Sequence, residues 1–215
     1  LVYEKPSTST VFFTHRDMVQ SQVGIFSSDG VYDEERQADY KYYSTYMGGG
    51  MSAVIFQEVR EARSLAYSAG GGYYGGAEKG DENALMARLG CQFDKTIEAT
   101  KLLHKLLQDM PSSVERFAES KKSIEQGYRT NTVGFRDVPG TIFAWQRLGL
   151  SGDPRPRRME KALAYELKDL EAFAARFKSK AMTLYVLGNK DRVDLEGLKS
   201  MGTFIEKPVS EIFPY

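Results

Sequence analysis

Residues Gly48–Gly76 read "GGGMSAVIFQEVREARSLAYSAGGGYYGG", and this stretch decides how the chain folds. Three glycines open it, because glycine ends one helix and permits a tight turn into the next. Helical spacing then predicts a helix over residues 51–63. Met51, Ile55 and Val59 are expected on one side of it. The small, aromatic and glycine residues that follow predict a strand.

Arg60 and Tyr67 stand on either side of the turn from helix to strand. Such a turn can bring both side chains to one edge of a sheet, where both are hydrogen-bond donors and the arginine is permanently charged. Donors aimed at a carbonyl can hold a peptide and stabilise the oxyanion formed when the carbonyl is attacked. The alternative is a solvated arginine that is paired with Glu58 or Glu61.

The glycines themselves leave two interpretations open. Residues 70–72 can let another backbone approach closely. The glycines at 48–50 precede a helix, whose N-terminus could bind an anion. A helix stop followed by a tight helix start is the favoured interpretation of those three.

The composition is that of an ordinary globular protein. The 215 residues carry 29 basic and 29 acidic side chains, so bulk charge does not indicate a nucleic-acid partner. Cys91 is the only cysteine, so no intrachain disulfide forms, and we expect it to be a buried apolar residue. No membrane span or signal peptide is visible. The missing initiator Met is compatible with a piece of a longer protein.

Periodicity elsewhere places strands and helices in separate blocks. Ser112 and Glu115 form an S-x-x-E pattern that predicts the start of a long helix, and "SGDPRPRR" (151–158) is expected to be a loop. Strands that are adjacent in sequence favour antiparallel pairing, so we expect one α+β domain over residues 1–215, with an antiparallel-rich sheet backed by a block of helices. Strands are predicted over residues 9–15, 20–28, 83–93, 181–188 and 203–205, and further helices over 34–47, 94–110, 139–150, 170–177 and 195–200.

The sequence offers no metal or phosphate motif. The only histidines, His15 and His104, belong neither to H-E-x-x-H nor to its inverted form, whereas a catalytic zinc normally takes three protein ligands. A G-x-S-x-G elbow and a phosphate-binding loop are also missing. We therefore expect no metal bound by this chain.

The opening stretch resembles the signature of the second, non-zinc type of domain in the pitrilysin and insulysin-like metallopeptidases. That signature has glycines, a small or Met residue, an apolar helix ending in Arg-Glu, and then Leu-Ala-Tyr or Leu-Gly-Tyr. Similarity to the family continues through "VFFTHRDMVQSQVGIFSSDG", "MTLYVLGNKD" and the closing "EIFPY". Arg63 lies close to Arg60, but it is out of register with the arginine of the signature. The matching residues are Gly48–Gly50, Met51, Ser52, Phe56, Arg60, Glu61, Leu65, Ala66 and Tyr67.

The resemblance implies a half-clamshell domain that faces a zinc-bearing, homologous domain across a peptide substrate. Arg60 and Tyr67 would be catalytic donors to the substrate carbonyl, and together with Gly70 and Gly71 they would bind the substrate. Zinc is expected on the partner domain, in the same polypeptide or in another subunit, because this chain has no H-x-x-E-H. The chain would then be a C-terminal piece of a multi-domain endopeptidase and inactive alone.

A second interpretation is a catalytically inactive scaffold or peptide-binding subunit of the same family. The sequence names no substrate. It also leaves the compartment open among the bacterial periplasm, the cytoplasm and an organelle.

Overall fold

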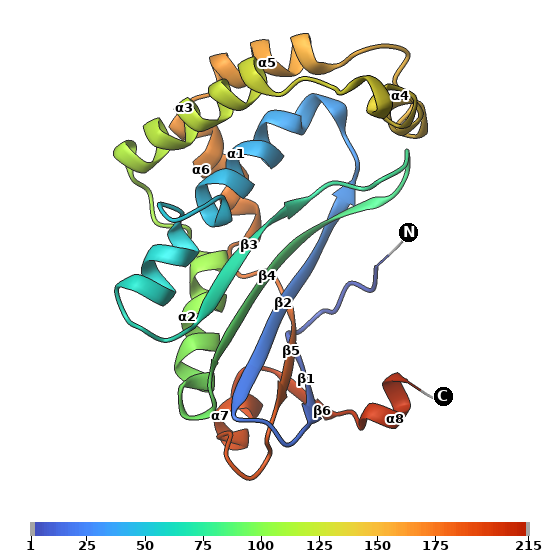
Figure 1. Cartoon of the computed structure of the whole chain (residues 1–215). Coiled ribbons are helices and arrows are strands. Elements are labelled where there is room, and N and C mark those ends of the chain that lie inside the picture. Colours follow the sequence, from blue (N-terminus) through green and yellow to red (C-terminus); the bar gives the residue numbers. More distant parts are fainter. Residues whose placement is uncertain (1–2, 214–215) are drawn as a thin grey trace.

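A six-stranded sheet runs through the molecule in the order β3-β4-β2-β5-β1-β6 (Figure 1). The computed structural model describes residues 3–213, so the last two residues of the "EIFPY" motif lie outside it. The pairs β3–β4, β4–β2 and β2–β5 are antiparallel, whereas β1 runs parallel to β5 and β6. The strands are β1 (Thr10–His15), β2 (Gln20–Val31), β3 (Ser68–Tyr74), β4 (Glu82–Gln92), β5 (Thr183–Gly188) and β6 (Thr203–Glu206).

The predicted antiparallel-rich α+β sheet is confirmed, but one expected pairing is wrong. β1 and β2 are adjacent in sequence yet do not pair, because β5 lies between them and uses both of its edges. A strand that arrives this late in the chain leaves no sign of its position in the local pattern of β1 and β2.

Helices cover one face of the sheet, and the other face is largely open (Figure 1). Alternation sets the two faces: Ala87 and Leu89 of β4 are buried against the helices, whereas Met86 and Arg88, which alternate with them, are exposed. The α-helices are α1 (Gln37–Gly48), α2 (Thr96–Gln108), α3 (Val114–Thr130), α4 (Val138–Arg147), α5 (Arg155–Ala164), α6 (Leu167–Ala174), α7 (Leu195–Lys199) and α8 (Val209–Ile212), with 3-10 turns η1 (Glu34–Arg36), η3 (Phe93–Lys95), η4 (Phe135–Asp137) and η5 (Ala175–Phe177) and the π-helical turn η2 (Phe56–Glu61).

Three local expectations about helices are wrong. Met51 is 76% exposed in a turn, because Gly50 has a φ of 130° and helical structure begins only at Val54. α5 begins inside the expected loop. A proline is tolerated in the first helical turn, because the N–H group that it lacks would have no hydrogen-bond partner within the helix there. Ser113, not Ser112, caps α3 by accepting a hydrogen bond from the Arg116 N–H at 3.2 Å.

The C-terminal end of α1 packs directly on the backbone of β3. A Cβ built on Gly48 would lie 1.8 Å from the Gly71 carbonyl oxygen. One turn earlier, the Ser44 hydroxyl accepts from the Tyr73 N–H and donates to the Tyr73 carbonyl, each at 2.9 Å. α1 therefore closes part of the outer edge of β3, where another strand could otherwise pair.

Asp29 of β2 connects its own strand with β3 and with the segment around η5, which are distant in the sequence. Its buried carboxylate accepts hydrogen bonds from the Tyr73 hydroxyl of β3 at 2.8 Å and from Arg176 of η5 at 2.9 Å, and Lys180 lies 3.3 Å away. Burial and this hydrogen bond to Asp29 raise the pKa of Tyr73, so the phenol stays protonated and continues to donate.

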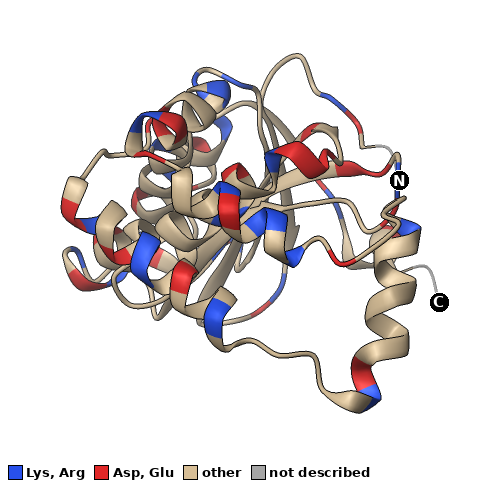
Figure 2. Cartoon of the chain, turned by 90° about the horizontal axis from the view of Figure 1, so that it is seen from above, with Lys and Arg blue, Asp and Glu red and all other residues tan. Residues whose placement is uncertain are grey.

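α4 lies apart from the core, beside the tip of the β3–β4 hairpin (Figures 1 and 2). None of its residues is buried, and Phe135 just before it is 93% exposed. The Lys79 N–H of the hairpin donates to the Arg147 carbonyl at 2.8 Å and holds its last turn. Exposed apolar side chains here are Phe135, Val138, Ile142 and Phe143.

Charged residues of both signs are interspersed over the helices in the view of Figure 2, as the balanced composition suggests. Among residues 3–213, no helix combines the length and hydropathy needed to cross a membrane.

Gly48→Ala is expected to lower the free energy of unfolding by about 3 kcal/mol, because the new methyl group overlaps the Gly71 backbone. Urea denaturation measures the change. Gly127→Ala in α3 is the matched control: its Cβ meets no atom within 4 Å, and it should raise stability by about 0.5–1 kcal/mol. An unchanged urea midpoint for Gly48→Ala would contradict the close packing of α1 on β3.

Candidate functional site

Arg60 and Tyr67 open onto the same pocket of about 400 Å³. The pocket lies at the end of the sheet where β3 begins and β4 ends. One wall comes from η2 and the turn after it, and the other from the end of β4 and the end of η3. The lining residues are Arg60, Glu61, Ser64, Leu65, Ala66, Tyr67, Gln92 and Lys95.

An irregular backbone brings the two side chains to this pocket. Within η2 the Ala62 N–H bonds to the Gln57 carbonyl five residues earlier, a π-helical step that occurs often at functional sites. Ser64 then takes a left-handed conformation with a φ of 51°, which is uncommon for a residue with a side chain. The reversal ends where the Tyr67 N–H bonds to the Gly90 carbonyl at 2.8 Å.

Gln92 holds the hydroxyl of Tyr67. Its Nε2 donates to the Tyr67 Oη at 2.8 Å, and the phenol is 54% exposed. Because the oxygen accepts this bond, the hydroxyl hydrogen stays available for another acceptor. The tyrosine is therefore an oriented donor that faces solvent.

Arg60 is exposed and only loosely paired. Its guanidinium lies 4.8 Å from the centroid of the Phe56 ring, and its Nε is 3.7 Å from a carboxylate oxygen of Glu61. An exposed pair at that distance contributes about 0–1 kcal/mol, so it leaves the guanidinium free to bind a ligand. Val59 beside it is fully buried and anchors the turn.

The glycines expected at the site lie elsewhere. Gly70 and Gly71 line a different hollow, of about 490 Å³, on the open face of the sheet. Gly71 has a structural reason to be glycine, since a Cβ there would lie 2.7 Å from the Ala87 Cβ of β4. Gly70 has no such neighbour, because a Cβ there would meet nothing within 4 Å.

Three residues of the Arg60 pocket were not expected from the sequence: Ser64, Gln92 and Lys95. Gln92 ends β4 and Lys95 ends η3, which follows it. The local pattern does not reveal the register of β4 with β3 that brings them here. The alternation of β4 does place Gln92 on the same face of the sheet as Met86 and Arg88. This alternation is the one feature of the sequence from which the position of Gln92 could have been predicted.

Other reactive side chains do not form a site. Among the described residues, no group of three or more His, Cys, Asp or Glu could hold a metal ion, so this part of the chain offers no zinc site. Burial lowers the pKa of His104 and favours its neutral form. Cys91 is fully buried as expected, and burial raises the pKa of its thiol to about 11.

Comparison with solved structures places the fold among those of M16-type peptidases. A peptidase M16 inactive domain from Pseudomonas fluorescens superposes with a TM-score of 0.73 at 17% identity, covering 87% of this chain and 46% of that chain. A protease from Helicobacter pylori superposes with a TM-score of 0.70 at 16% identity, covering 83% of this chain and 44% of that chain. A conserved protein from Enterococcus faecalis V583 superposes with a TM-score of 0.71 at 11% identity, covering 89% of this chain and 44% of that chain. The chain thus spans less than half the length of each.

Sequence comparison gives the family. Residues 1–124 match the family described as peptidase M16 inactive domain. The chain therefore belongs to the M16 peptidases and is an inactive-type domain of that family. Among curated protein sequences, none matches it closely enough to count as a relative.

Cys91 should not react with a thiol reagent in the native protein. At pH 8 a thiol with a pKa of about 11 is ionised in about one molecule in a thousand, and it is also shielded from solvent. Titration with Ellman's reagent is expected to show negligible reaction over minutes, and one thiol per chain after denaturation in urea. Rapid native labelling would contradict the buried placement.

Proposed function

We propose that this chain is the complementary, substrate-binding domain of a zinc-dependent endopeptidase. The observation that carries the proposal is the pocket that Arg60 and Tyr67 share. Family membership supports it, since an inactive-type domain of a peptidase family has no metal chemistry of its own to perform. Zinc would be held by a partner domain and supplies the activated water there.

In this role the chain's own residues bind and orient an extended peptide. The Arg60 guanidinium and the free hydroxyl hydrogen of Tyr67 are donors for the scissile carbonyl oxygen, on which negative charge develops. Gln92 keeps the phenol in place, so little reorganisation is needed when the substrate arrives. Substrate contacts of Gly70 and Gly71 remain a prediction for the part of the peptide that reaches the open face.

The partner is proposed to be a homologous domain, in the same polypeptide or in another subunit. The solved relatives are about twice as long as this chain, which supports a second domain of similar size. The exposed apolar side chains around α4 also support a protein partner, because apolar patches of this kind mark interaction sites. Closure of two such domains would bring Arg60 and Tyr67 to the substrate.

A catalytically inactive scaffold or peptide-binding subunit is the second candidate. The description of the family as inactive and the lack of a metal-binding group among residues 3–213 favour it. The retained Arg60 and Tyr67 favour the first candidate, because a scaffold does not need a donor pair beside a pocket.

Arg60→Ala and Tyr67→Phe are expected to lower turnover of the intact assembly by about 10²–10³-fold each, as the loss of a transition-state donor does. Zinc content and the affinity between the domains should not change. Steady-state cleavage of an unstructured peptide and metal analysis on the same preparations measure both quantities.

Two matched variants control for unspecific effects. Arg63→Ala removes an exposed arginine three residues away that does not line the pocket. Tyr128→Phe removes the hydroxyl of a half-buried tyrosine in α3 that does not line the pocket. Both should keep full turnover. Zinc loss in Arg60→Ala, or equal losses in the controls, would contradict the donor role.

A further inference from the structure

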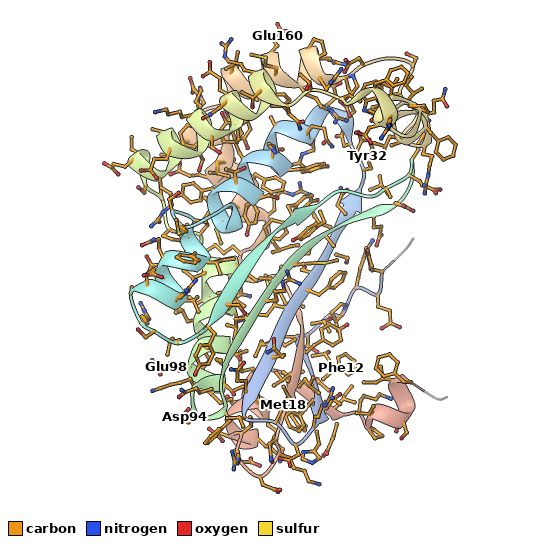
Figure 3. The ribbon with its side chains drawn as sticks, viewed as in Figure 1. Phe12, Met18, Tyr32, Asp94, Glu98 and Glu160 are labelled. Atoms are coloured by element: carbon orange, nitrogen blue, oxygen red, sulfur yellow. The ribbon has the colours of Figure 1, made fainter. Side chains whose placement is uncertain are left out.

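The open face of the sheet carries one charged side chain between two glycines. Arg88 of β4 is in register with Gly70 of β3 on one side and with Gly24 of β2 on the other. The same row continues to Tyr185 of β5 and Phe12 of β1, whose rings stack 5.5 Å apart. Phe12, labelled in Figure 3, lies on this side of the sheet.

The two glycines leave room beside the guanidinium. A Cβ built on Gly70 meets nothing within 4 Å, and one on Gly24 meets only the Tyr185 Cβ at 3.9 Å. Arg88 is exposed and has no hydrogen bond or ion pair within the described part of the chain.

Two hollows meet at this arginine. One, of about 490 Å³, extends along β3 and β4 past Tyr74 and Met86, and the other, of about 660 Å³, extends under α8. Arg88, Gly24 and Tyr185 line both. Among the described residues that line them, Glu211 is the one acidic residue, and Lys207 already pairs with it at 2.8 Å. Arg16 also lines the hollow under α8, whereas Arg88 lines both hollows.

The combination is an extended apolar trough with an unpaired cation at its centre. Tyr74, Met86 and Tyr185 expose apolar surface around Arg88. Desolvation by such neighbours strengthens the attraction between a guanidinium and a carboxylate. Charge complementarity therefore selects a peptide that presents Asp or Glu between apolar side chains.

We propose that Arg88 is a specificity-determining residue that binds an acidic side chain of the peptide substrate on the open face of the sheet. The inference rests on the proposed function, because it assumes that peptides bind this chain. It adds a substrate class, peptides with an acidic residue flanked by apolar ones, at a position separate from Arg60 and Tyr67.

The test titrates fluorescein-labelled, unstructured ten-residue peptides into the intact native assembly, with a chelator present to prevent cleavage. Two peptides differ only in a central Glu or Gln between Leu and Phe. Fluorescence anisotropy should show about fivefold tighter binding of the Glu peptide, and high salt should reduce the preference. Arg88→Gln should bind both peptides equally, and Arg88→Lys should keep part of the preference.

Arg63→Gln, an exposed arginine that lines neither hollow, is the control and should keep the full preference. Circular dichroism on each variant verifies folding. Equal binding of both peptides to the wild type, or a preference that survives in Arg88→Gln, would overturn the inference and leave the proposed function intact.

Two other outcomes separate the proposals further. If no peptide binds the wild type, the proposed function fails and this inference fails with it. If Arg88→Gln weakens association of the domains in gel filtration while the Glu preference persists, the carboxylate belongs to the partner domain, and a substrate role for Arg88 is wrong.

Discussion

The contact between Gly48 and Gly71 is the constraint on which the rest of the structure depends. It presses the last turn of α1 onto the backbone of β3, at a distance that a single methyl group on Gly48 would not allow. These two residues also bound the segment that carries Arg60 and Tyr67. Because the ends of that segment touch, its backbone leaves α1, forms η2 and returns within a closed loop, and this loop contains the π-helical step and the left-handed Ser64.

The same constraint bears on the two proposed binding surfaces. α1 occupies part of the outer edge of β3, so a peptide cannot simply pair with that edge at Tyr73. The two proposed binding surfaces are the pocket at the start of β3 and the open face of the sheet. Arg60 and Tyr67 supply donors in the pocket, and Arg88 supplies a cation on the face. A peptide that reaches both would be held at a carbonyl by one surface and at a side chain by the other.

The sequence predicted most of what depends on local spacing. The helix predicted over residues 34–47 forms as η1 and α1, and the turn from Arg60 to Tyr67 does bring both side chains to one pocket. What depends on register or on distant strands was not accessible. The place of β5 between β1 and β2, the bond from Gln92 to Tyr67 and the glycine neighbours of Arg88 all follow from strand pairing. α5 was missed because its prolines are typical of loops as well as of first helical turns.

The most direct test of the complementary-domain role is to purify the full-length native protein with whatever copurifies, and to measure its zinc content together with cleavage of an unstructured peptide mixture. The 215-residue chain alone is measured beside it. The role predicts about one zinc per assembly, cleavage that a chelator abolishes, and no cleavage by the chain alone. An intact assembly with neither zinc nor cleavage would contradict it.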